Sequence, residues 1–162
     1  MRTVQETPTA RSDYALLSVT YLALLGGLAE STRRRGDGLI ELPAAELAPL
    51  SMAAFALSKM VVHEKVETWM RAPFVEELPE GERRPKGRRL RYAVGELLTC
   101  TRCMGAWGAL GLVAVRTFAP REARLLTGVL AVSAGSDFLH SAFNLICREA
   151  NLAGAQVEAN RS

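Results

Sequence analysis

The stretch 96–113 reads ELLTCTRCMGAWGALGLV, and it decides how the rest of the chain is interpreted. It is apolar and studded with glycines, which is typical of a helix that enters a membrane. Cys100 and Cys103 stand two residues apart near its start. Such a pair can bind a metal, exchange with a disulfide or pack as small polarizable side chains, and the stretch by itself leaves all three open.

Three further apolar segments accompany this one. The four segments cover residues 13–29, 47–63, 97–116 and 123–147, and charged connectors separate them. Alanine and leucine dominate, and period-two alternation is absent, so the pattern predicts helices. We therefore expect an all-α fold, an antiparallel bundle of four short transmembrane helices with a basic cytoplasmic loop.

The length of 162 residues fits one domain that can bury a core without disulfide staples. The predicted helical domain covers 13–147, with a charged loop at about 75–95. A flexible N-terminus (1–12) precedes it and a flexible tail (148–162) follows it. Three cysteines, an odd number, argue against a secreted disulfide framework and for a reducing compartment or a thiol with a specific role.

Charged residues decide between membrane spans and a soluble bundle. Crossing the hydrocarbon takes roughly 20 residues, and Lys59, Arg102, Arg116 and Asp137 interrupt or border shorter uncharged runs. The three basic side chains lie near segment ends, where they can reach the interface, so Asp137 is the only charge near a segment centre. Small residues in the last two segments suit close helix contacts in a membrane. These features suit membrane spans, and a soluble helical bundle stays open as the alternative until the family resemblance described below is added.

The connector after the second segment carries more basic residues than the other connectors together. By the positive-inside rule, this loop and both termini face the cytoplasm, in a bacterial inner membrane. We expect the cluster in this loop to contact anionic lipid headgroups; it comprises Arg83, Arg84, Lys86, Arg88, Arg89 and Arg91. Nucleic acid is a weak alternative, because only Tyr92 supplies an aromatic ring there.

That topology gathers the cysteines on one rim of the bundle. His63 ends the second segment, Cys100 and Cys103 begin the third, and Cys147 ends the fourth. A set of three cysteines and one histidine suits structural zinc, and a pair at a helix N-terminus suits thiol redox chemistry. Packing is the third interpretation.

A polar stripe follows the last segment. Its members recur every three or four residues, as one face of a helix requires, and they are Ser133, Asp137, His140, Asn144 and Cys147. In a membrane, Asp137 and His140 could relay protons or bind an ion. In a soluble bundle the stripe would be the solvated face.

Two stretches, LSKMVVHEKVETWMRAPF and GELLTCTRCMGAWGAL, resemble a small bacterial and phage integral-membrane family of unknown function. Some of its members carry sporulation-protein names. The resemblance covers about 47–147, and the matching residues are Arg71, Pro73, Phe74, Glu96, Leu97, Leu98, Cys100, Cys103 and Trp107. It implies a membrane location and no activity, and it adds Trp107 to the candidate binding residues.

No nucleophile with a base at fixed spacing and no phosphate-binding glycine loop stands in the sequence, so a non-enzymatic role is favoured. The first hypothesis is a polytopic membrane protein that acts as an interaction or assembly factor with membrane or cytoplasmic proteins. The second is a membrane thiol-redox or metal-binding protein that uses Cys100 and Cys103. The third is a soluble helical bundle that binds other helices.

Overall fold

The computed structural model describes residues 8–35, 42–79 and 81–159, so part of each predicted flexible end (1–7 and 160–162) lies outside it. The elements are α1 (Arg11–Arg34), α2 (Ala44–His63), α3 (Thr68–Arg71), β1 (Val75–Glu77), β2 (Arg83–Pro85), α4 (Leu90–Thr99), α5 (Thr101–Phe118) and α6 (Pro120–Ala159). The predicted all-α fold is confirmed; three of the four apolar segments lie within single helices, and the third is divided between α4 and α5. The exception is one antiparallel hairpin, β1–β2, within the predicted charged loop.

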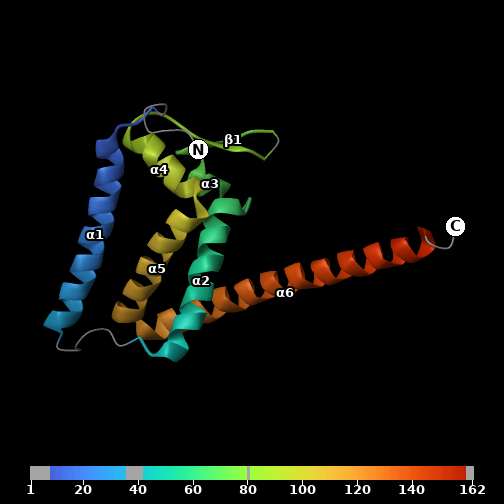
Figure 1. Cartoon of the computed structure of the whole chain (residues 1–162). Helices are drawn as coiled ribbons and strands as arrows, with labels where there is room; N and C mark the ends of the chain where they lie inside the picture. The colour runs from blue at the N-terminus through green and yellow to red at the C-terminus, as the bar shows by residue number, and fades with distance from the viewer. Residues whose placement is uncertain (1–7, 36–41, 80, 160–162) are drawn as a thin grey trace.

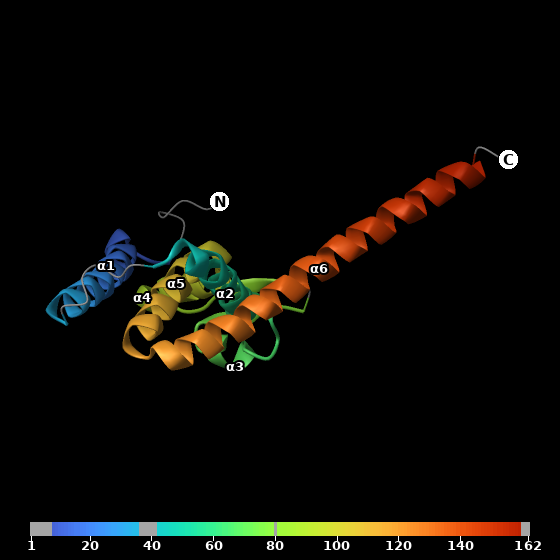
Figure 2. The same cartoon turned by 90° about the horizontal axis from the view of Figure 1, so that it is seen from below.

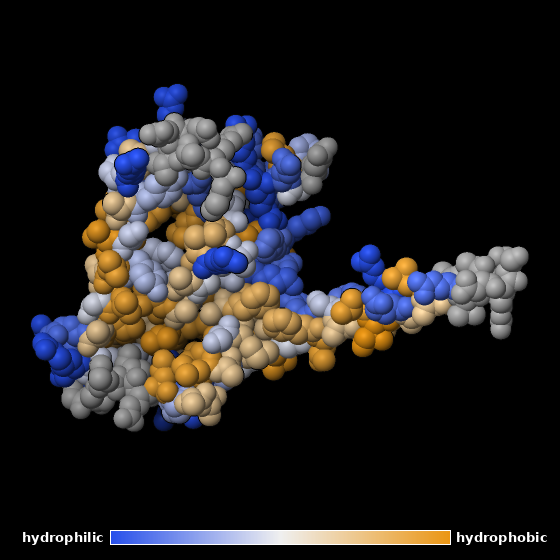
Figure 3. Space-filling view, in the orientation of Figure 1, coloured by the Kyte–Doolittle hydropathy of each residue, from blue (hydrophilic) through white to orange (hydrophobic). Residues whose placement is uncertain are grey.

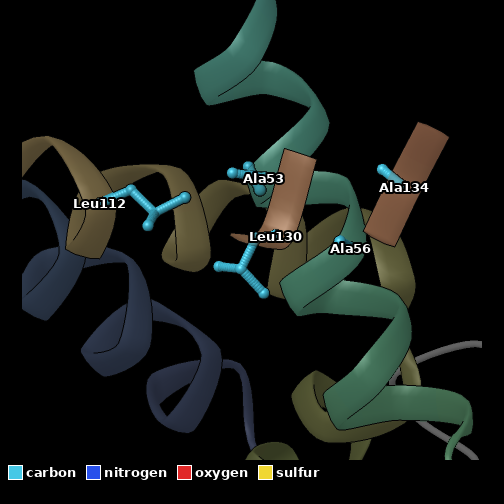
Figure 4. Close-up of a cluster of buried hydrophobic side chains, with 6 residues drawn as sticks. Ala53, Ala56, Leu112, Leu130 and Ala134 are labelled. Atoms are coloured by element: carbon cyan, nitrogen blue, oxygen red, sulfur yellow. The ribbon is translucent and has the colours of Figure 1, made fainter. Parts of the chain in front are cut away.

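The core of the bundle lies where α2, α5 and α6 meet. Its buried cluster consists of Ala53, Ala54, Ala56, Leu112, Leu130 and Ala134 (Figure 4). Alanine dominates because small side chains let helix backbones approach closely. Gly108 of α5 shows this directly, since a Cβ added there would lie 3.4 Å from Leu57 Cδ2 and 3.8 Å from the Ala54 carbonyl oxygen.

Contacts between helix ends define the directions of α2 and α5. His63 at the end of α2 hydrogen-bonds Thr101 at the start of α5, with 3.0 Å between Nε2 and Oγ1. At the opposite end, Arg116 of α5 binds both carboxylate oxygens of Glu46 of α2, at 2.9 and 3.0 Å. The two helices are therefore antiparallel, and a polar contact closes each end of the pair.

The last helix, α6, first packs on α2 and then leaves the bundle. Leu130 and Ala134 join the core, and Asp137 pairs with Lys59 near the end of α2. Beyond that point α6 projects away from the other helices in both views (Figures 1 and 2). It also continues as helix to Ala159, past residue 147 where we placed the end of the helical domain. The continuation contains alanine, leucine, arginine and glutamate, which are good helix formers.

The first helix, α1, stands beside the bundle and not within it (Figure 2). Only Asp13, Leu28 and Thr32 of its residues are buried. Several of its large apolar side chains are exposed, among them Leu16, Val19, Leu22, Leu24 and Leu25.

Residues 64–79 and 81–89, called here the polar cap, cover the end of the bundle where α2 stops (Figure 1). Arg71 is fully buried in the cap and donates hydrogen bonds to the carbonyl oxygens of Val61 and Glu64. Arg83 donates to those of Val62 and His63. The last carbonyls of a helix have no partner within the helix, so these two guanidinium groups terminate α2.

The third predicted segment is not one straight helix, and this corrects the sequence analysis. The chain bends by 91° between α4 and α5, at Cys100. Cys100 has an extended backbone (φ −105°, ψ 105°) and forms the N-cap of α5. Helix α4 instead packs on the hairpin: a Cβ on Gly95 would lie 2.5 Å from the Phe74 carbonyl oxygen. The predicted loop at about 75–95 thus holds the hairpin and half of a helix.

Three described helices are long and apolar enough to cross a membrane, namely α1, α2 and α6, and the bent pair α4–α5 would be a fourth. These are properties of length and composition. The space-filling view shows apolar surface over the helical body and polar surface over the cap end (Figure 3).

Candidate functional site

The two cysteines of the opening stretch lie at the junction of α4 and α5. Cys100 is the N-cap of α5, and the backbone N–H of Cys103 donates to its Sγ at 3.4 Å. The Cys100 carbonyl accepts the first helical bond, from Met104 N at 2.9 Å. Both thiols are free; Cys103 is exposed and Cys100 half-buried. The predicted placement of the pair at the start of a helix is therefore correct.

Both cysteines face a groove of about 630 Å³ between α1 and the α4–α5 junction. Most of its lining is apolar: Leu17, Leu22, Ala93, Leu97 and Ala106. The polar groups other than the thiols are Tyr14, Ser18 and Glu96. The lining around the thiols is therefore mainly apolar but also includes three other polar side chains.

Trp107 separates this groove from a second one. The second groove, of about 480 Å³, runs farther along α1 and α5, and its lining includes Leu24, Leu110 and Phe118. Trp107 lines both grooves and meets Tyr21 of α1 edge to face, with 5.4 Å between ring centroids. This is a favourable aromatic geometry. Trp107, which the family resemblance singled out, thus contacts α1 at the place where the two grooves adjoin.

Polar contacts fix α1 at the cysteine end of the grooves. The Tyr14 hydroxyl donates to Glu96, which comes four residues before Cys100. Asp13 pairs with Arg89 of the cap at 3.4 Å, and the Arg89 N–H donates to the Pro8 carbonyl at 2.9 Å. These contacts hold the start of α1 in place at the end of the groove that lies beside the cap.

The predicted set of Cys100, Cys103, Cys147 and His63 is only partly brought together. His63 lies beside Thr101, next to the cysteine pair. Cys147 lies on the projecting part of α6, ten residues beyond the contact of Asp137 with Lys59. Among the described residues, no group of three or more histidine, cysteine, aspartate or glutamate side chains is placed to hold a metal ion. The expected convergence fails for Cys147 because α6 leaves the bundle and does not return to its rim.

The polar stripe of α6 is divided by its contacts. Asp137 forms an ion pair with Lys59 at 2.8 Å, and Phe138 stacks on Phe55 of α2. His140, Ser133 and Asn144 are exposed. The carboxylate that we considered for proton relay therefore has a cationic partner on the neighbouring helix, while His140 lies beyond that contact.

Most of the basic cluster is engaged within the protein. Arg83 contacts α2 and Glu77, Arg89 contacts Asp13, Lys86 binds the Ala72 carbonyl, and Arg91 binds the Pro73 carbonyl. Of the six residues, Arg84 and Arg88 have exposed side chains that form no ion pair or hydrogen bond with the other described residues. These two are the charges that a headgroup could contact.

The cap also contains a perturbed carboxylate. Glu77 accepts a hydrogen bond from Arg71 at 2.8 Å and another from Thr68 at 3.1 Å. The Arg71 hydrogen bond is the main reason why the pKa of Glu77 lies below its ordinary value. Partial desolvation opposes this effect, and the charges of Arg71 and Arg83 reinforce it.

Two features of the site escaped sequence reasoning. Tyr14 and Tyr21 line the groove from α1, and more than eighty residues separate each from its partner in the chain, so no local pattern predicts the contact. The Lys59–Asp137 pair had a signal, since each of these opposite charges interrupts a long apolar run.

These features define a helical-bundle protein with membrane-length apolar helices, a polar cap and a cysteine pair at their junction. The chain belongs to the family described as "Protein of unknown function (DUF1360)", whose model matches residues 49–143. It is also similar to "Sporulation protein YjcA" of Bacillus subtilis (strain 168), with 32% identity over 92 residues, which is 52% of this chain and 78% of that protein. No solved structure gives a significant match. The resemblance stated from the two sequence stretches is confirmed.

Proposed function

We propose that the protein is a multi-pass membrane protein that works as an interaction or assembly factor. The observation that carries the proposal is a body of apolar helices topped by a folded polar cap (Figure 3). Large apolar side chains are exposed along α6 as well as α1, including Leu125, Val129, Val132, Leu139, Phe143 and Ile146. Contiguous exposed apolar surface of this extent is unusual on a soluble monomer and normal against lipid.

The cap faces the cytoplasm in this proposal, in a bacterial inner membrane. The positive-inside rule supports this orientation, since the cap and its flanks carry the cluster from Arg83 to Arg91. Arg84 and Arg88 then lie at the height of the headgroups and attract anionic lipid. Because Asp13 and Pro8 contact Arg89 of the cap, the start of α1 lies on the same side in this proposal.

The cap is the part of the protein that a cytoplasmic or membrane partner would meet. Trp69 and Val66 of the cap are 73% and 80% exposed, and exposed aromatic and aliphatic side chains beside charged ones are common in binding surfaces. The relative's name, a sporulation protein, supports a role in a cellular process and names no reaction.

Alkaline carbonate extraction of membranes from expressing bacteria tests the proposal. We expect the protein to stay in the membrane pellet and to enter solution only with detergent. A peripheral membrane protein in the same sample serves as the control that carbonate releases. Recovery of the protein in the carbonate supernatant would favour the soluble-bundle alternative.

A further inference from the structure

We propose that Cys100 and Cys103 form a dithiol that reduces a lipophilic quinone bound in the groove between α1 and α5. This adds a redox step to the proposed function, and the step needs only one folded chain. It does not depend on which side of a membrane the cap faces.

The thiol half of the proposal rests on the arrangement of the pair. Cys100 occupies the N-cap of an 18-residue helix, and the N–H of Cys103 points at its sulfur. Helix N-termini and N–H groups stabilise a thiolate, which is the reactive form, and Cys-x-x-Cys pairs at such positions cycle between dithiol and disulfide. Cys103 is exposed one helical turn away and can resolve an intermediate formed on Cys100.

The ligand half rests on the grooves. The two volumes, about 630 and 480 Å³, meet at Trp107 and follow α1 and α5 away from the cysteines. The first groove combines its apolar lining with Tyr14, Ser18, Glu96 and the two thiols, whereas leucines, alanines, glycines and Phe118 line the second, together with Ser31. This gradient suits a small polar ring attached to a long hydrocarbon tail. Tyr21 and Trp107 offer aromatic faces and edges to a planar ring.

A lipid-soluble quinone also supplies the oxidant that a dithiol needs. The Cys100 thiolate forms a bond to a ring carbon of the quinone. The Cys103 sulfur then attacks the Cys100 sulfur, so that the S–S bond forms, the C–S bond breaks and the electron pair returns to the ring. Both thiol protons end on the ring oxygens. One dithiol thus becomes one disulfide as one quinone becomes one hydroquinone.

The reaction is tested on purified, reduced, full-length protein in detergent, without oxygen. The probe is a fully substituted benzoquinone with a decyl tail, since the absence of ring hydrogens prevents stable arylation of thiols. Alkylation followed by mass analysis should show Cys100 and Cys103 joined and Cys147 still free, with one hydroquinone formed per disulfide. The same quinone without its tail should react at least about tenfold more slowly, because it lacks the tail that the apolar groove buries.

Variants separate the site from general thiol reactivity. Cys103→Ser should form no disulfide and release no hydroquinone, whereas Cys147→Ser should react as the wild type does. Ala106→Phe, which fills the groove, should slow the reaction, and Ala109→Phe, exposed on the same helix outside the groove lining, should not. Both phenylalanine variants are first checked for native helicity, and if Ala106→Phe does not fold, Ala106→Leu replaces it.

Binding has its own readout in Trp107. In a Trp69→Phe background, Trp107 is the sole tryptophan, and the decyl quinone should quench its fluorescence to saturation. The proposal is overturned if quinone leaves the pair reduced, if Cys147 is oxidised equally fast, or if the tail makes no difference. Faster oxidation by glutathione disulfide than by the decyl quinone would also overturn it, in favour of exchange with hydrophilic disulfides.

Discussion

Lys59 Nζ lies 2.8 Å from Asp137 Oδ2, and this ion pair joins α2 to the last part of α6 that touches the bundle. Both charges stand in segments that are mainly apolar. Placing a charged side chain in the hydrocarbon of a membrane costs free energy, and the ion pair offsets part of this cost for both Lys59 and Asp137. Under the proposed membrane location, the contact therefore offsets the cost of a carboxylate near the middle of α6.

We predict that Asp137→Asn destabilises the protein through Lys59. A double-mutant cycle with Lys59→Met should give a coupling free energy of about 1 kcal/mol, the upper part of the range for polar contacts between membrane helices. The measurement is unfolding of the protein in mixed micelles. His140→Gln, an exposed change one turn along α6, should leave the free energy of unfolding unaltered. A coupling free energy near zero would contradict this structural role. If Asp137→Asn then also altered the quinone reaction, Asp137 would be a functional carboxylate.

Gly95→Ala should destabilise the contact between α4 and the hairpin. The new Cβ would lie 2.5 Å from the Phe74 carbonyl oxygen and 3.0 Å from Pro85 Cβ, and backbone must move to admit it. We expect a loss of about 1–3 kcal/mol, as for overpacked cores. Gly128→Ala is the matched control, because a Cβ there meets nothing within 4 Å; it should be neutral or raise stability by up to about 1 kcal/mol. Equal effects of the two variants would contradict the close approach.

Glu77 makes stability depend on pH. Its pKa is held below the ordinary 4.5, chiefly by the hydrogen bond from Arg71, so its contribution is present above about pH 4.5 and disappears as the pH falls through the lowered value. Melting temperatures measured from pH 7 down to about pH 3 should therefore fall more for the wild type than for Glu77→Gln. The neighbouring Glu76→Gln should follow the wild type, because Glu76 is exposed and forms no ion pair with Arg71 or Arg83, which both pair with Glu77. Parallel curves for wild type and Glu77→Gln would refute the assignment.

Arg84 and Arg88 should account for the preference for anionic lipid. Replacing both by glutamine should reduce the extra stability in phosphatidylglycerol nanodiscs over neutral ones by about 1 kcal/mol per residue at low salt. Added salt should shrink the difference. Arg33→Gln, at the opposite end of α1, is the control and should change little. If Arg33→Gln has the larger effect, the cap is not the end that contacts anionic headgroups.

Sequence reasoning located the helices because their signal is local. Runs of alanine and leucine without alternation specify helix wherever they stand, and the segments 13–29, 47–63 and 123–147 lie wholly within helices. The bend at Cys100 was not visible, because it depends on the packing of Gly95 against Phe74, which are far apart along the chain. Tertiary contact overrode local propensity at that point.

Only the part of the candidate site that has a local sequence signal could be predicted. The Cys100–Cys103 pair is a local motif and lies at a helix start, as its position in the sequence indicates. The groove exists because α1 stands off from the bundle, and that depends on contacts of Tyr14 and Tyr21 with residues of the opening stretch. The placement of Cys147 assumed a fourth helix of ordinary length, whereas α6 runs for 40 residues.

The orientation in the membrane is the central claim, and labelling of single cysteines tests it most directly. In a background with all three native cysteines changed to serine, Arg84→Cys marks the cap and Arg121→Cys marks the start of α6. Spheroplasts are treated with a membrane-impermeant maleimide before and after lysis. We predict that Arg121→Cys is labelled in intact spheroplasts and Arg84→Cys only after lysis. Labelling of Arg84→Cys in intact spheroplasts, or of neither residue until lysis, would contradict a membrane-spanning bundle with a cytoplasmic cap.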